Sequence, residues 1–198
     1  MKLPGSFLHR LARDRDGATI VEFAFVVTPL FMVLLGLTDF GYRIYVDSVV
    51  QGTVYRAARL ATVGDKTADQ IDDFVKAQLM TFSGNGVVTI DKKNYYQFSN
   101  VDNTEKWIDK NNDGVFNHGD CWIDSNPDNP TDGPGPTARD GLGGSDDIVF
   151  YKVTLTYPRI IPLGGFFGWS DTQTISAKTL MRNQPYASQA TPPCRDAP

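Results

Sequence analysis

An apolar run directly after Gly17 constrains the fold of this chain more than any other feature. The run spans residues 18–38, contains no basic side chain and carries a single acid, Glu22. As an α-helix it would be roughly 30 Å long, which matches the hydrocarbon core of a bilayer. We therefore predict a transmembrane helix at about residues 18–38. An ionised carboxylate at that depth is costly unless a partner neutralises it, so Glu22 needs a specific explanation.

Charge is distributed unevenly along the sequence. The net charge is −4, of which residues 1–17 contribute +2 and the remaining residues −6. Basic residues ahead of the apolar run predict a cytoplasmic N-terminus and a C-terminal head on the other side of the membrane. Between residues 100 and 147, eleven acids stand against three basic residues. A surface of that sign attracts cations, and we expect no nucleic acid partner.

Residues 1–17 are typical of a leader peptide rather than of a folded element. In an ordinary secretory signal the small residue of the cleavage site follows a short apolar core, whereas here Gly17 precedes a core of spanning length. Cleavage between Gly17 and Ala18 would leave the apolar helix attached and would place Glu22 at the fifth position of the mature chain. The alternative is an uncleaved signal anchor whose Glu22 reaches the cytoplasmic headgroups.

The order of these features resembles the TadE/TadG family of pilin-like proteins. The resemblance covers about residues 16–63 and rests on Gly17, Glu22, Pro29, Gly36-Leu37-Thr38-Asp39-Phe40-Gly41 and Tyr55-Arg56-Ala57-Ala58-Arg59. It implies a minor pilin or pseudopilin of a tight-adherence, Flp-type pilus system that takes part in pilus assembly and surface adhesion. The implied partners are a prepilin peptidase, the pilus assembly platform and other pilin subunits, which would pack against the N-terminal helix. In a filament, Glu22 could then neutralise the Ala18 amine of a neighbouring subunit.

The resemblance also implies a location: a single pass through the inner membrane with a periplasmic head, followed by an extracellular pilus after assembly.

Apolar residues at three- and four-residue steps predict that the first helix continues to about residue 63. Thr67 and Gln70 form a capping box that predicts a second helix. Strands are predicted at 87–90 and 95–98, separated by a turn at 91–94, and at 148–157 and 172–182.

These elements predict an α+β, type IV pilin-like fold with a small antiparallel β-sheet. Its expected parts are a leader at 1–17, a long N-terminal helix at 18–63, a head at 64–184 with an irregular acidic loop at 100–146, and a tail at 185–198.

Residues 109–120 match the spacing of a calcium-binding loop, with Gly114 at the sharp turn of position 6. Asp120 stands where EF-hands carry Glu, and no flanking helix pair is predicted, so only the loop is similar to an EF-hand. The alternative is an ordinary polar surface loop. The predicted Ca²⁺ ligands are Asp109, Asn111, Asp113, Val115, Asn117 and Asp120.

A partial repeat fifteen residues later offers a weaker second set of ligands, Asp124, Asn126 and Asp128, although two prolines crowd its turn. The two cysteines, Cys121 and Cys194, both follow the membrane segment, where an oxidising compartment would let them pair. Two free thiols are the alternative.

No catalytic constellation is recognisable, because His9 falls in the leader, His118 falls in the acidic loop, and no nucleophile stands at motif spacing from either. We therefore expect a protein that is not an enzyme. Two hypotheses follow: a pilin that joins a filament, or a permanently membrane-anchored calcium-binding module for adhesion or ligand binding.

Overall fold

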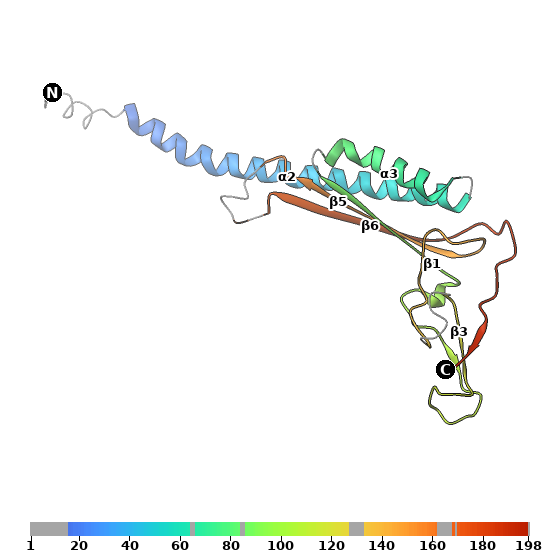
Figure 1. The fold of residues 1–198 in the computed structure, drawn as a ribbon. Helices are drawn as coiled ribbons and strands as arrows, with labels where there is room; N and C mark the ends of the chain where they lie inside the picture. Colours follow the sequence, from blue (N-terminus) through green and yellow to red (C-terminus); the bar gives the residue numbers. More distant parts are fainter. Residues whose placement is uncertain are drawn as a thin grey trace, which may run out of the picture. The chain divides into compact units, whose positions relative to one another are not determined.

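The computed structural model describes residues 16–63, 66–83, 86–126, 133–161, 168 and 170–197. The chain divides into two compact units, Met1–Ile44 and Tyr45–Pro198. Within the first unit, the described residues belong to helix α2 (Asp16–Val63). The second unit contains the rest of that helix and every other element named below (Figure 1).

Helix α2 is continuous from Asp16 to Val63, so the long predicted helix is confirmed. It passes through Pro29, which has no N–H to donate to the carbonyl of Phe25. Beside the proline, the hydroxyl of Thr28 donates to the carbonyl of Ala24 at 2.7 Å. The helix nevertheless continues past Pro29 to Val63.

In the second unit, helix α3 (Ala68–Ser83) lies beside the C-terminal part of α2 (Figure 1). Its predicted capping box is confirmed: the Thr67 N–H donates to Gln70 Oε1 at 3.1 Å, and the Gln70 N–H donates to Thr67 Oγ1 at 3.3 Å. The rings of Tyr45 and Phe82 meet edge to face at 5.8 Å between centroids. Both helices bury a regular apolar face, made of Val46, Val50, Val54, Ala57, Ala61, Ile71, Val75 and Leu79.

Four antiparallel strands form the larger sheet, in the order β4-β1-β5-β6. Their bounds are Val87–Tyr95 for β1, Arg139–Asp140 for β4, Ile148–Pro158 for β5 and Thr172–Arg182 for β6. The predictions for residues 148–157 and 172–182 are confirmed. Alternate residues of β5 are fully buried, namely Val149, Tyr151, Val153, Leu155 and Tyr157, whereas the residues between them are partly exposed.

The prediction of two short strands with a turn at 91–94 was wrong, because β1 runs without interruption to Tyr95. Its polar residues have partners far along the sequence. Lys92 Nζ lies 2.7 Å from a carboxylate oxygen of Asp72 on α3, and the Asn94 amide donates to the carbonyl oxygen of Arg139 on β4 at 3.2 Å. Partners of this kind, rather than a turn, account for the Asp-Lys-Lys-Asn sequence.

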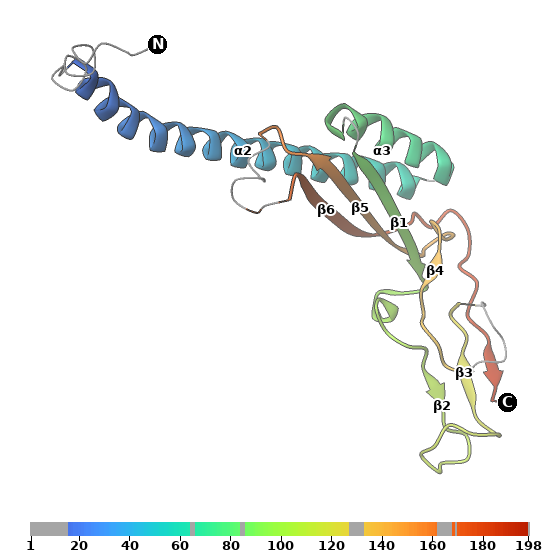
Figure 2. The same cartoon turned by 60° about the vertical axis from the view of Figure 1, so that its left-hand side comes forward.

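The acidic loop contains more regular structure than predicted (Figure 2). A 3₁₀ helix, η1 (Phe98–Asn100), is followed by strands β2 (Trp107–Ile108) and β3 (Cys121–Ile123). The residues predicted as a tail include strand β7 (Cys194–Asp196), which pairs with β3 and completes a second antiparallel sheet in the order β2-β3-β7. Trp122 is buried in this sheet, with the ring of Phe116 6.0 Å away. The fold class is α+β, as predicted, and it is consistent with a pilin-like fold.

Candidate functional site

The N-terminal part of α2 exposes an unusual amount of apolar surface. Thirteen large apolar side chains between Ile20 and Phe40 are 36 to 77% exposed. Among the described residues, α2 is the one helix long and apolar enough to cross a membrane, with a mean hydropathy of 2.4 over its most apolar window. This helix is therefore compatible with single-pass membrane anchoring.

The residues predicted for leader cleavage and assembly lie at the start of this helix. Gly17, Ala18 and Glu22 are all helical and exposed. Because Glu22 follows Ala18 by four positions, the two lie on the same helix face, one turn apart. Residues 1–15 of the predicted leader lie outside the described residues, and cleavage after Gly17 stays a prediction.

Within the acidic loop, residues 109–120 bring together three carboxylates that are not adjacent in the sequence. Oxygen atoms of Asp109, Asp113 and Asp120 all lie within 4.8 Å of one another. The backbone turns sharply to achieve this, with φ of +60° at Asn112 and +77° at Gly114. Asp109 holds the turn, since its two carboxylate oxygens accept the N–H groups of Asn112 at 2.5 Å and Gly114 at 2.9 Å.

Local hydrogen bonds favour the ionised form of Asp113. Its carboxylate accepts the Val115 N–H at 2.8 Å and the Asn117 amide at 2.5 Å, and these contacts lower the pKa of Asp113 below its ordinary value. Asp120 is fully buried and accepts the N–H groups of Lys110 and Asn117, each at 3.0 Å. In the described part of the chain, none of the three carboxylates forms an ion pair with a lysine or arginine. The three carboxylates therefore converge without a basic side chain among the described residues.

The other predicted ligands of this loop lie around the same centre. The Asn111 amide donates to Asp113 and to Asn117 Oδ1, both at 3.0 Å, so the nitrogen of this amide faces the carboxylates. Binding of a cation through the amide oxygens requires Asn111 and Asn117 to rotate. Val115 directly follows Gly114 and is exposed.

The weaker second set has other partners. Asp124 is buried and forms an ion pair with Arg195 of β7. The amide of Asn126 is also buried and donates to the carbonyl of Ala138 at 3.0 Å. Asp128 lies outside the described residues. The two described members of this set therefore hold the C-terminal strand and a neighbouring loop segment.

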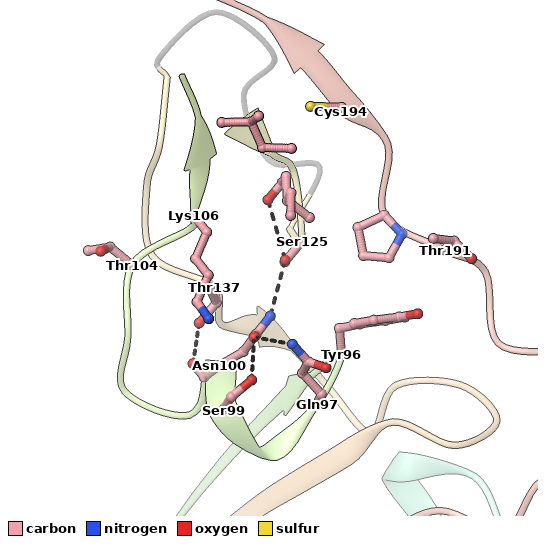
Figure 3. Close-up of a pocket in the computed structure, with 13 residues that line it drawn as sticks. Tyr96, Gln97, Ser99, Asn100, Thr104, Lys106, Ser125, Thr137, Thr191 and Cys194 are labelled. Carbon is pink, nitrogen blue, oxygen red and sulfur yellow. Dashed lines mark hydrogen bonds between the residues drawn. The ribbon is translucent and has the colours of Figure 1, made fainter. Parts of the chain in front are cut away.

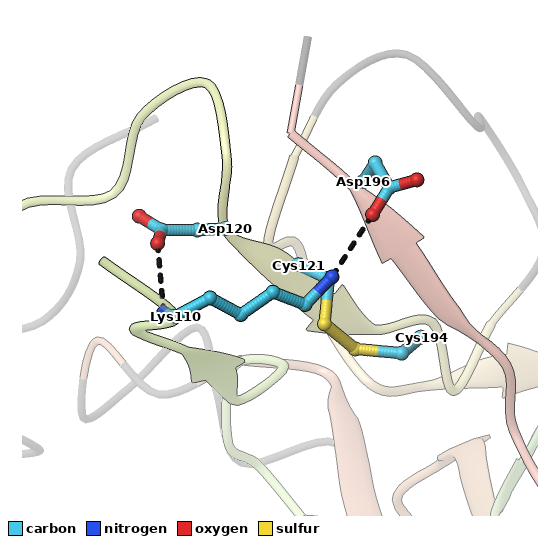
Figure 4. The surroundings of a disulfide bond; sticks show 5 residues. All are labelled: Lys110, Asp120, Cys121, Cys194 and Asp196. Carbon is cyan, nitrogen blue, oxygen red and sulfur yellow. Dashed lines mark hydrogen bonds and ion pairs between the residues drawn. A yellow bond between two sulfur atoms is a disulfide. The ribbon is translucent and has the colours of Figure 1, made fainter. Parts of the chain in front are cut away.

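A disulfide joins Cys121 to Cys194, as predicted, with 5.6 Å between their Cα atoms (Figure 4). The disulfide connects β3 with β7, and its Cys121 directly follows Asp120 in the sequence. Lys110 Nζ also forms an ion pair with Asp196 of β7, at 3.1 Å. The acidic loop is therefore fixed at its end by the C-terminal strand. The roles of Lys110, Arg195 and Asp196 are not apparent from the sequence, because a three-residue strand in a proline-rich segment gives no periodic signal.

Together, the apolar helix and the α+β head define a class: proteins with an N-terminal membrane-compatible helix and a head consistent with a pilin-like fold. The family model described as TadE-like protein matches residues 17–59, which confirms the resemblance found in the sequence. The TadE-like family comprises structural pilus components, and the match indicates a protein that is associated with a tight-adherence pilus and interacts with other pilus components. Comparison with curated proteins and with solved structures found no match.

Proposed function

We propose that this chain is a minor pilin or pseudopilin of a tight-adherence pilus, processed by prepilin peptidase between Gly17 and Ala18. The observation that carries the proposal is the exposed apolar start of α2, with Glu22 inside it, in the segment that matches the TadE-like family. In this proposal the helix inserts in the inner membrane with a cytoplasmic N-terminus. The head is periplasmic and becomes extracellular when the subunit enters a pilus.

The chemistry of the helix start explains why cleavage and assembly would be coupled. Before cleavage, the Glu22 carboxylate lies among apolar side chains with no cationic group at its depth. Cleavage creates a new amine at Ala18, one turn away on the same face. When helices pack side by side, the carboxylate of one subunit can pair with the amine of the next, which offsets the cost of placing both in lipid.

Processing is tested first by mass spectrometry of the native protein. We expect the mature chain to begin at Ala18, and Gly17→Ala to retain all seventeen leader residues. A native chain that begins at Met1 would instead support the second candidate, a permanently anchored calcium-binding adhesion or ligand-binding module. The observation that favours this second candidate is the three convergent carboxylates of the acidic loop.

Assembly is tested by Glu22→Ala. We expect this variant to be cleaved normally but to be absent from purified pili, because no carboxylate is left to neutralise the Ala18 amine of a neighbour. Asp47→Ala is the matched control, since it removes an acid from the same helix beyond the apolar run and should assemble normally. Normal incorporation of Glu22→Ala would refute the role given to this carboxylate.

We also propose that the acidic loop binds one Ca²⁺ ion through Asp109, Asp113 and Asp120, assisted by the Val115 carbonyl and the side-chain oxygens of Asn111 and Asn117. The support is the close approach of three carboxylates without a lysine or arginine partner among the described residues, together with the ionised state that the loop favours for Asp113. Ca²⁺ prefers several carboxylate and carbonyl oxygens, which this loop supplies.

Thermal unfolding of the full-length protein in phosphatidylcholine nanodiscs tests the metal. A dissociation constant of about 0.1 to 1 mM, typical of extracellular calcium modules, predicts that 10 mM Ca²⁺ stabilises the head by about 1.4 to 2.7 kcal/mol. Asp113→Ala should abolish this shift, whereas Asp140→Ala, which removes an exposed acid outside the group, should retain it. Absence of any Ca²⁺-dependent shift in the unmodified protein would refute the site.

A further inference from the structure

A pocket of about 340 Å³ lies in the second unit, bordered by the chain around η1, by strands β2 and β3, and by the segment before β7 (Figure 3). This volume is at the lower end of the range for small-molecule sites, which suits one small ligand or one residue of a polymer. The lining includes no residue of α2 and none of the six predicted Ca²⁺ ligands of residues 109–120.

The pocket is lined largely by apolar groups. Ile108 and Ile123 contribute from the two paired strands, Pro192 and Cys194 from the C-terminal segment, and Tyr96 provides an aromatic side chain (Figure 3). Because Cys194 is joined to Cys121, the disulfide fastens one wall of the pocket to the opposite strand.

The polar groups at its base are already paired. The Asn100 amide donates to Ser125 Oγ at 3.1 Å, and the Thr137 hydroxyl donates to the Asn100 carbonyl (Figure 3). In contrast, no side-chain partner among the described residues is present for Tyr96, Thr104, Lys106 or Thr191. Thr104 and Thr191 lie on opposite sides in Figure 3, so the available hydroxyl groups are spread around the pocket rather than gathered at one end.

Charge in the pocket is opposite to that of its surroundings. Lys106 is the one charged residue in the lining, which includes no acid, although residues 100–147 contain eleven acids. The neighbouring carboxylate of Glu105 is buried elsewhere, where it accepts backbone N–H groups, including those of Ser125 at 2.5 Å and Gly135 at 3.2 Å. A ligand with a negative group can thus reach the Lys106 ammonium without meeting a carboxylate in the lining.

We infer that this pocket binds an acidic sugar, a hexuronate unit of a glycan. The apolar walls and the Tyr96 ring suit the C–H faces of a pyranose, the dispersed hydroxyl groups suit its hydroxyls, and Lys106 suits its carboxylate. A fatty acid would need polar contacts only at its carboxylate end, which the dispersed hydroxyls do not match. The inference goes beyond the proposed pilin role, because it holds whether or not the head is carried by a filament.

Two tetrasaccharides that differ only in the group at C6 of each ring provide the test. β-1,4-linked tetraglucuronate carries a carboxylate on each ring, and cellotetraose has the same linkage with a hydroxymethyl group in its place. Binding of both is measured by NMR titration of the full-length protein in phosphatidylcholine nanodiscs, which present no sugar headgroup. We expect tetraglucuronate to bind more tightly than cellotetraose and to shift the amide signals of Ser99 and Thr191, which line the pocket.

Lys106→Met should weaken tetraglucuronate binding about tenfold or more, as expected for the loss of a charge-assisted hydrogen bond, and should leave cellotetraose binding unchanged. Lys76→Met is the matched control, because it removes the same charge from the exposed face of α3 and should change neither affinity. Tyr96→Ala should weaken both ligands. Unchanged amide spectra away from the pocket establish that the variants are folded.

The inference is overturned if tetraglucuronate does not bind at millimolar concentration, if cellotetraose binds equally well, or if Lys106→Met binds tetraglucuronate as the unmodified protein does. Pilus incorporation, measured separately for Lys106→Met, should be normal. Failure of sugar binding and failure of the proposed pilin role are therefore distinguishable.

Discussion

Replacing Gly143 with alanine should destabilise the larger sheet more than its single added methyl group suggests. Gly143 has φ of +66°, and a Cβ atom there would lie 2.6 Å from Asp147 Oδ2 and 2.9 Å from Asn94 Cβ. Asp147 cannot move aside freely, because it is 4% exposed and its Oδ2 accepts the Gly144 N–H at 2.8 Å. The same oxygen lies 3.0 Å from the guanidinium of Arg139 on β4.

The expected cost follows from these contacts. A positive φ costs alanine about 1 kcal/mol, and loss of a hydrogen bond to the buried carboxylate costs about 2 kcal/mol more. We therefore expect Gly143→Ala to lower the free energy of opening by about 3 kcal/mol, measured by hydrogen exchange of β1 and β5 amides in the full-length protein.

Gly141→Ala is the control in the same turn. Gly141 also has a positive φ, +96°, but a Cβ atom there would meet nothing within 4 Å, so only the backbone term applies. Gly143→Ala should be the more destabilising of the two by about 2 kcal/mol. If the two variants lower amide protection equally, the crowding around Asp147 is not what the Gly143 position requires.

Three further predictions concern the head. Replacing both Cys121 and Cys194 with serine should cost about 4 kcal/mol, the loop entropy of a 73-residue separation, seen as faster amide exchange in β3; unchanged protection would contradict this. Glu105→Gln should cost about 1 to 3 kcal/mol in thermal unfolding, because an amide nitrogen would then face a backbone donor; an unaltered melting temperature would be inconsistent with that geometry. Burial and the nearby Asp72 carboxylate raise the pKa of Tyr151 above its ordinary value of 10.0, so unfolding experiments should show stability falling as pH rises above about 10, and a Tyr151→Phe variant with the same slope would contradict this assignment.

The sequence predicts those elements whose signals are local and repeated. The long apolar and amphipathic pattern defines α2, the Thr67–Gln70 pair marks the start of α3, and alternation from Val149 to Tyr157 defines β5. In each case the periodicity or the cap belongs to the element itself, so no knowledge of distant partners is needed. Residues 109–120 of the acidic loop are recognisable for the same reason, since their carboxylates converge through short-range turns.

Other features depend on partners that the sequence does not reveal. Polar residues at 91–94 favour a turn locally, but pairing with β5 and the contact of Lys92 with Asp72 keep them in a strand. Strands of two or three residues, such as β2 and β7, are too short to show a period. The residues that line the pocket range from Tyr96 to Cys194 in the sequence. That Lys106 is the one charged residue among them is apparent only in the folded structure, where the surrounding acids lie elsewhere.

The pairing of β3 with β7 sets a delay in the maturation of the head. At a synthesis rate of about 5 to 20 residues per second, the 73 residues between the two cysteines take roughly 4 to 15 s to appear. During that interval Cys121 is a thiol without its partner, and β3 has only the two-residue β2 beside it. The second sheet therefore forms late, because β3 can pair with β7 only after the chain has been synthesised as far as Asp196.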